Sequence, residues 1–173
     1  MVIWLIGLSG AGKTTVGRIL VEQLRDQAYS VAFVDGDVLR DVWGDNPGHD
    51  LSGRGTNARR ISQLCRFLDQ QGITVVASVL SIFPDWQQWN RRTFSSYYEV
   101  FLNTPLAVVE ARDYKGLYRA ARSGEMRNVV GIDIPFPVPP APDLVLSPPE
   151  ILEPPDAIAK RILEALPEAP SVR

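Results

Sequence analysis

The opening of the chain limits the possible folds more than any other stretch does. Residues 2–6 are an unbroken apolar run, VIWLI, and the segment GLSGAGKT follows at once at residues 7–14. This segment fits the pattern G-x-x-x-x-G-K-[ST], in which glycines let backbone N–H groups turn toward phosphate oxygens. Residues 15–27 then carry apolar side chains at helical spacing, so a bound phosphate would face a helix N-terminus. The sequence predicts a buried strand, a phosphate-binding loop and a helix. A glycine-rich turn without a ligand is the alternative.

The polar residues of this loop have predicted tasks. The lysine of the pattern reaches the β and γ phosphates of a nucleoside triphosphate, and the hydroxyl that follows it ligates Mg²⁺. The residues expected to bind ATP are Gly7, Ser9, Gly10, Ala11, Gly12, Lys13, Thr14 and Thr15.

Composition excludes several classes of protein. A chain of 173 residues with 45% hydrophobic content can bury one sizeable core, so we expect one domain over residues 1–167. The formal net charge of −2 argues against nucleic acid or an anionic membrane as partner, because either needs a basic face. The single cysteine, Cys65, excludes an internal disulfide and falls in an apolar helical stripe, which predicts packing rather than chemistry. We find no signal segment and no apolar run near the ~20 residues that span a bilayer, so we expect a cytoplasmic protein.

Strand and helix signals alternate along the chain. Short apolar runs predict four further strands, and periodic apolar residues predict helices between them. A loop is expected over residues 43–53, which are rich in Gly, Asp and Asn. The expected strands are 31–34, 73–80, 99–102 and 144–146, and the expected helices are 54–71, 83–96, 105–112 and 156–166. This order predicts an α/β fold with a five-stranded parallel sheet and helices on both faces.

Polar residues follow two of these strands at the sheet edge where α/β proteins hold ligands. Asp35 and Asp37 end the second strand, and Ser81 ends the third. Asp35 is expected to help Thr14 hold the metal, and Asp37 to orient or deprotonate an acceptor hydroxyl. The alternatives are that one carboxylate only caps a helix starting near Val38, and that Ser81 only satisfies a backbone group.

Two later segments differ in character. Residues 113–131 have weak apolar periodicity, and Lys115, Arg119 and Arg122 would share one face of a helix there. We interpret this segment as a mobile basic lid, with a solvated helix as the alternative. Residues 134–155 contain nine prolines and should be mostly extended, and residues 168–173 should form a flexible tail.

Taken together, these signals favour a P-loop kinase over a GTPase or motor ATPase. A compact Asp-Gly-Asp segment, a basic lid and a short chain suit transfer to a hydroxyl under a cover that excludes water. Trp86 and Trp89 lie three residues apart on the helix expected at 83–96, where they either cover the core or form the surface of a homodimer.

The chain resembles the adenylylsulfate kinases, which phosphorylate the ribose 3′-hydroxyl of adenosine 5′-phosphosulfate with ATP. The resemblance covers nearly the whole chain. It rests on the loop at 7–14, the Asp-Gly-Asp segment with the arginine at position 40, R-x-x-N at 54–57, the R-D-x-K-G-L-Y element at 112–118 and G-I-D at 131–133. It implies that Asp37, Arg40, Arg54, Asn57, Ser81 and Lys115 line the acceptor site and that Arg112 lies beside the adenine of ATP.

This sequence departs from the family pattern on the acceptor side. The family usually places two phenylalanines around the acceptor's adenine, and His49 and Val129 stand at these positions here. Gly53 and Thr56 replace the acidic residues of D-R-x-E-N. Another nucleotide-like acceptor, such as cytidine diphosphoramidate, is therefore an alternative. A regulator without turnover and a simple NTP hydrolase are alternatives from other classes.

Overall fold

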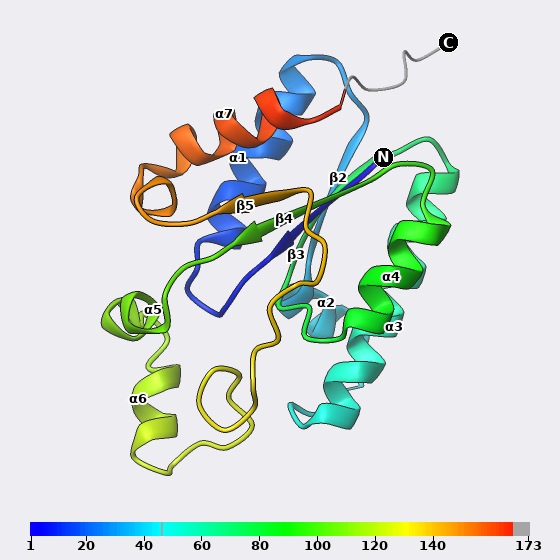
Figure 1. Cartoon of the computed structure of the whole chain (residues 1–173). Helices are drawn as coiled ribbons and strands as arrows, with labels where there is room; N and C mark the ends of the chain where they lie inside the picture. The colour runs from blue at the N-terminus through cyan, green and yellow to red at the C-terminus, as the bar shows by residue number, and fades with distance from the viewer. Residues whose placement is uncertain (46, 168–173) are drawn as a thin grey trace.

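The computed structural model describes residues 1–45 and 47–167, which build a parallel sheet covered by helices on both faces (Figure 1). The tail expected at 168–173 lies outside the described residues. The strands are β1 (Val2–Ile6), β2 (Val31–Asp35), β3 (Thr74–Val79), β4 (Tyr97–Leu102) and β5 (Leu144–Leu146). The helices are α1 (Lys13–Asp26), α2 (Gly36–Val42), α3 (Leu51–Gln70), α4 (Pro84–Thr93), α5 (Leu106–Arg112), α6 (Leu117–Arg122) and α7 (Pro155–Ala165), with a 3₁₀ turn at Glu150–Leu152.

The five strands lie in the order β2-β3-β1-β4-β5, and every pair is parallel. This confirms the predicted α/β fold. All residues of β1 are buried, because the strand lies at the centre of the sheet with helices on both sides. Ile3 and Leu5 belong to the apolar cluster that includes α1 and α7, whereas Trp4 belongs to the cluster that includes α3.

The carboxyl ends of the strands meet at one edge of the sheet, where the phosphate-binding loop, α2, α5 and α6 also lie (Figure 1). Register explains this arrangement. Ile6, the last residue of β1, pairs with Val79 on β3, and Asp35 at the end of β2 pairs with Ser78. The loop, the acidic segment and the residues after β3 are therefore neighbours.

Several predicted boundaries were wrong, each for a local reason. Helix α3 begins at Leu51 rather than at residue 54, because the Asp50 carboxylate accepts a hydrogen bond from Gly53 N at 2.7 Å and caps the helix earlier. Strand β4 begins at Tyr97, two residues before the predicted start. The predicted helix 83–96 ends at Thr93, because Phe94 is already extended.

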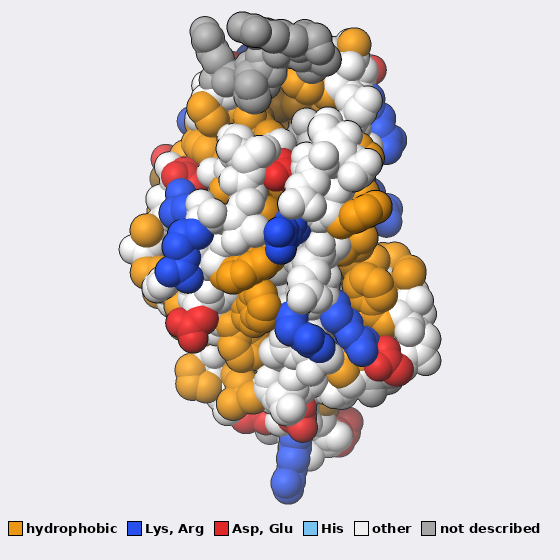
Figure 2. All heavy atoms as spheres, turned by 90° about the vertical axis from the view of Figure 1, so that its right-hand side faces the viewer, with side chains coloured by type: hydrophobic (Ala, Val, Ile, Leu, Met, Phe, Trp, Pro, Cys, Tyr) orange, Lys and Arg blue, Asp and Glu red, His pale blue; other side chains and the backbone are white. Residues whose placement is uncertain are grey.

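The outer face of α3 and α4 is turned to the viewer in Figure 2, where apolar side chains lie among basic ones. Phe67 on α3 is 59% exposed. Trp86 and Trp89 on α4 pack edge to face with ring centroids 5.3 Å apart and are half-buried. Cys65 is fully buried, which confirms its packing role.

None of the helices within residues 1–45 and 47–167 is both long and apolar enough to cross a membrane.

Candidate active site

The phosphate-binding loop joins β1 directly to α1. Gly10 and Gly12 adopt positive φ angles of 78° and 94°, a backbone region that favours glycine. At Gly7, glycine is required by space rather than by φ, because a Cβ there would lie 2.9 Å from the backbone oxygen of Leu102. Among the described residues, no side chain caps the start of α1, and its first turn holds no acidic residue. The N-terminal N–H groups of α1 are therefore available to an anion.

Lys13 is folded back onto its own loop. Its Nζ donates to the carbonyl oxygens of Gly7 and Leu8 at 2.8 and 2.7 Å. The side chain is half-buried rather than solvent-facing. Loss of hydration on burial lowers the pKa of Lys13 to about 8, against the opposing pull of Asp37 and Asp35. Phosphate oxygens could replace the two carbonyls as partners of this ammonium group.

Asp35 is buried between the phosphate-binding loop and α2, and its carboxylate accepts hydrogen bonds from both sides. Its Oδ1 accepts from the backbone N–H groups of Asp37 and Val38, so of the two carboxylates Asp35 is the one that caps α2. Its Oδ2 accepts from the Thr14 hydroxyl at 2.7 Å. The hydroxyl and carboxylate predicted to hold the metal are thus in direct contact.

These oxygens suit Mg²⁺. It is a hard cation that takes one or two protein oxygens together with phosphates and waters, rather than an all-protein cage. In residues 1–45 and 47–167 no group of three or more His, Cys, Asp or Glu side chains could hold a metal. The donor set of Thr14 and Asp35 is the small one that a metal shared with nucleotide phosphates needs.

Asp37 projects from the first turn of α2 and is largely exposed. Its Oδ2 accepts from Lys115 Nζ at 2.9 Å, which links α2 to the segment between α5 and α6. Desolvation opposes ionisation of this carboxylate, but the hydrogen bond and charge of Lys115, with Lys13 and Arg40, lower the pKa of Asp37 below its usual value. Asp37 is therefore ionised at neutral pH and can accept a hydrogen bond from a hydroxyl.

Two arginines lie beside this carboxylate. Arg40 donates to the Gly48 carbonyl at 2.7 Å, and Arg54 donates to the carbonyls of His49 and Asn128, both at 2.7 Å. Partial loss of hydration, together with the positive charges of both arginines, lowers the pKa of His49, so its imidazole is neutral at pH 7. The cluster carries more positive than negative charge and suits an anionic acceptor.

Gly53 explains how the loop before α3 reaches these arginines. A Cβ at this position would lie 2.0 Å from the Pro47 carbonyl oxygen and 2.6 Å from that of Gly48. Only glycine lets the loop pack onto the first turn of α3. Gly53 therefore permits the path of the loop that carries His49.

Two predicted acceptor residues hold structural contacts here. Asn57 is 6% exposed, donates to the Gly36 carbonyl and accepts from Trp43 Nε1, both at 3.3 Å. Val129 is 2% exposed and belongs to the apolar core, so in this structure it offers no face to a base. The family resemblance implies an acceptor-site position for Val129, but its side chain packs inward.

The predicted lid is only partly helical. Helix α6 spans six residues, and Lys115 precedes it, so the predicted shared helical face was wrong. Lys115 pairs with Asp37, and Arg122 pairs with Glu110 on α5 at 2.8 Å. Arg119 is exposed and stands near Gly116, where a Cβ would lie 3.3 Å from its guanidinium.

Sequence reasoning gave no role to Tyr118, although it lies in the K-G-L-Y element. Its hydroxyl donates to the Ser9 carbonyl at 2.8 Å, which attaches α6 to the phosphate-binding loop. Burial raises the pKa of Tyr118 to about 12, so the phenol keeps the proton that it donates. Arg112, at the end of α5, is one turn beyond Val109, and a Cβ at Gly10 would lie 3.6 Å from Val109. These contacts place α5 and α6 against the phosphate-binding loop.

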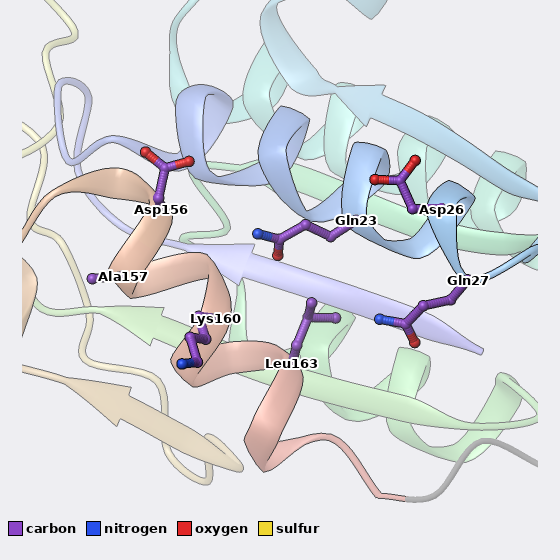
Figure 3. Close-up of a pocket in the computed structure, with 7 residues that line it drawn as sticks. All are labelled: Gln23, Asp26, Gln27, Asp156, Ala157, Lys160 and Leu163. Atoms are coloured by element: carbon purple, nitrogen blue, oxygen red, sulfur yellow. The ribbon is translucent and has the colours of Figure 1, made fainter.

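A groove of about 540 Å³ between α1 and α7 holds none of these residues (Figure 3). It is lined by Gln23, Asp26, Gln27, Asp156, Ala157, Lys160 and Leu163. The chemistry-bearing groups lie instead at the carboxyl edge of the sheet.

Comparison with known proteins gives a consistent result. The family model described as adenylylsulphate kinase matches residues 1–147. A probable adenylyl-sulfate kinase from Synechocystis sp. is 44% identical over 142 residues, which cover 82% of this chain and 80% of the relative. A cytidine diphosphoramidate kinase from Campylobacter jejuni is 38% identical over 146 residues, which cover 84% of this chain and 85% of the relative. The solved structure of a Mycobacterium tuberculosis APS kinase in complex with AMPPNP and APS matches with a TM-score of 0.87 and 33% identity, covering 95% of each chain.

Proposed function

Because this chain belongs to the adenylylsulfate kinase family, we propose that it transfers the γ-phosphoryl group of ATP to the ribose 3′-hydroxyl of adenosine 5′-phosphosulfate. The products are ADP and 3′-phosphoadenosine 5′-phosphosulfate. The observation that carries the proposal is that a phosphate-binding half, with Lys13 and Thr14, meets a basic acceptor half, with Arg40 and Arg54, at one sheet edge. Since the reaction consumes ATP, we propose that it takes place in the cytoplasm.

The reaction breaks the bond between the γ-phosphorus and the β,γ-bridging oxygen and forms a bond from that phosphorus to the 3′-oxygen. Such a transfer needs little covalent help, so the protein's work is to align the groups and stabilise charge. Lys13 would leave the two loop carbonyls and donate to phosphate oxygens. Mg²⁺, held through Thr14 and Asp35, supplies neutralisation of phosphate charge when bound.

Asp37 would orient the acceptor hydroxyl and take up its proton. The lowered pKa makes it a weak base, which suits a loose transition state in which the hydroxyl keeps most of its proton until late. Lys115 would have to release Asp37 or share it with the hydroxyl. Arg40 and Arg54 would bind the anionic end of the acceptor, and Arg112 would lie near the adenine of ATP.

A second candidate is phosphorylation of cytidine diphosphoramidate. It is favoured by the departures on the acceptor side, where a neutral His49 and an inward-packed Val129 replace an aromatic sandwich. The relative named as a cytidine diphosphoramidate kinase is 38% identical to this chain, against 44% for the Synechocystis relative. Stacking on aromatic rings contributes about 1–3 kcal/mol per base, so this loss would weaken binding of adenine.

An ADP-release assay with Mg-ATP and a panel of acceptors tests both candidates. We expect turnover with adenosine 5′-phosphosulfate, and at least about 100-fold less with Lys13→Ala of unchanged melting temperature. Greater turnover with cytidine diphosphoramidate would transfer the proposal to the second candidate. Release that needs no acceptor would indicate a hydrolase, and nucleotide binding without release would indicate a regulator.

The oligomeric state is a separate proposal. We propose a homodimer that uses the outer face of α3 and α4, where Phe67 is exposed (Figure 2). Light scattering of the purified protein distinguishes a dimer from a monomer.

A further inference from the structure

Ser81 stands in a rare backbone conformation beside the acceptor half. Its φ of 53° lies in the left-handed region, which non-glycine residues seldom adopt. It follows β3 by two residues, and Val79 on that strand pairs with Ile6, the residue before the phosphate-binding loop. Phe83, two residues further, lies against α3, since a Cβ at Gly55 would be 3.7 Å from its ring. Ser81 is thus placed between the loop and the segment of α3 that carries the acceptor arginine.

Two buried side chains donate hydrogen bonds to the Ser81 hydroxyl oxygen. Trp4 Nε1 lies 3.1 Å from Ser81 Oγ, and Gln87 Nε2 lies 3.2 Å from it. Gln87 Nε2 also donates to the Ser81 carbonyl at 2.9 Å. Trp4 is 2% exposed and Gln87 is 3% exposed, so neither donor has water as an easy substitute.

Chemistry fixes which end of the Gln87 amide faces the serine. A backbone carbonyl only accepts, so the NH₂ group and not the amide oxygen must point at the Ser81 carbonyl. The amide oxygen of Gln87 is buried and, among the described residues, has no hydrogen-bond partner. Within that set of residues, the hydrogen bonds to Ser81 are what orients this side chain.

The direction of the Ser81 hydroxyl follows. A hydroxyl oxygen accepts up to two hydrogen bonds and donates one. The indole N–H of Trp4 and the amide N–H of Gln87 take up both acceptor positions of the Ser81 oxygen. The hydroxyl can then make one more hydrogen bond, by donating its own proton. We propose that Trp4 and Gln87 are positioning residues that hold the Ser81 hydroxyl as a hydrogen-bond donor to an oxygen of the bound acceptor nucleotide. This inference rests on the proposed function and deepens its acceptor half.

The test replaces the amide donor and keeps the size of the side chain. In Gln87→Met, the Ser81 oxygen loses the hydrogen bond that it accepts from the Gln87 amide. The hydroxyl can then rotate, so that its proton no longer points at the acceptor nucleotide. We expect the acceptor KM to rise about 3- to 10-fold, while kcat and the KM for ATP stay within about twofold. Gln88→Met makes the same chemical change on the exposed face of α4 and should behave as the wild type.

A double-mutant cycle with Ser81→Ala separates positioning from a general structural effect. If Gln87 acts through Ser81, adding Gln87→Met to Ser81→Ala should change the acceptor KM by less than about twofold. An equal multiplicative rise in both backgrounds, or an unchanged KM in the single Gln87 variant, would overturn the proposal. If Gln87→Met does not fold, the same double-mutant cycle is measured with Trp4→Phe and Ser81→Ala. Absence of turnover by the wild type with every acceptor would instead contradict the proposed function.

Discussion

At the scale of single residues, Lys13 shows how a binding loop is prepared for its ligand. The Lys13 side chain is half-buried, and its ammonium group donates to two carbonyls of its own loop. Loss of hydration lowers its pKa to about 8. Phosphate oxygens carry full negative charge, so their arrival should stabilise the protonated lysine and raise this pKa again.

This difference predicts a pH dependence of nucleotide binding. Above pH 8 the free protein increasingly loses the Lys13 proton, and ATP binding must then take one up. We expect the apparent Kd for a non-hydrolysable ATP analogue to be about 10-fold higher at pH 9 than at pH 7. Calorimetric titration with Lys13→Met as control measures this, since that variant should bind weakly with no pH trend. A wild-type Kd that is constant between pH 7 and 9 would contradict the role of Lys13.

The effect of the same group on stability has the opposite sign. Its folded-state pKa of about 8 lies below its ordinary value of 10.5, so the unfolded chain holds this proton more tightly. The contribution of Lys13 to the free energy of unfolding therefore rises as the pH increases from 8 toward 10.5. Between pH 8 and 10.5 we therefore expect the free energy of unfolding to gain from Lys13 while the affinity for ATP falls.

At the scale of elements, the segment from α5 to the G-I-D motif is anchored at three places. Tyr118 attaches α6 to the phosphate-binding loop, Lys115 reaches Asp37 on α2, and Arg54 on α3 holds the carbonyl of Asn128. Val129 and Val130 are buried. Residues 123–127, which lie between Arg122 and Asn128, are all exposed. We therefore expect the mobile part of the predicted lid to be narrower than residues 113–131.

Hydrogen exchange tests this refined prediction. We expect amides of residues 123–127 to exchange rapidly in the free protein and to become roughly 10-fold more protected with an ATP analogue and acceptor together. Amides of α7 provide a reference, because that helix packs against α1 at the end of the molecule away from α6 (Figure 1). Equal exchange of residues 123–127 with and without ligands would indicate a solvated segment and no lid.

At the scale of the whole molecule, the parts of the chain with strong periodicity were predicted and the tertiary contacts were not. The loop pattern and the apolar runs specify the parallel sheet, because β1 and β3 are buried on both faces and need covering helices. The contacts of Ser81 with Trp4 and Gln87 depend on residues 77 and 6 positions away in the chain. No local pattern announces such contacts. The inward packing of Val129 was missed likewise, because a family pattern gives a position and not the direction of its side chain.

The packing of α1 on the sheet gives a last prediction that concerns the stability of the entire fold. Gly17 is buried in α1, and a Cβ there would lie 2.6 Å from the Phe33 ring and 2.7 Å from Ser78 Oγ. The Ser78 hydroxyl donates to the Lys13 carbonyl at 3.0 Å, so it cannot move without loss. Gly17→Ala should lower the free energy of unfolding by about 1–3 kcal/mol, because overpacking outweighs the helix propensity of alanine.

Gly55 on α3 is the matched control, since its added Cβ would meet only the Phe83 ring at an ordinary 3.7 Å. Gly55→Ala should therefore raise the free energy of unfolding by about 0.5–1 kcal/mol through helix propensity alone. Urea denaturation of both variants measures the two changes. Opposite signs would show that close contact of α1 with β2 and β3 sets the position of the phosphate-binding loop at the helix N-terminus. A rise in both variants would mean that α1 can shift without cost, and the loop would then not be held rigidly by the sheet.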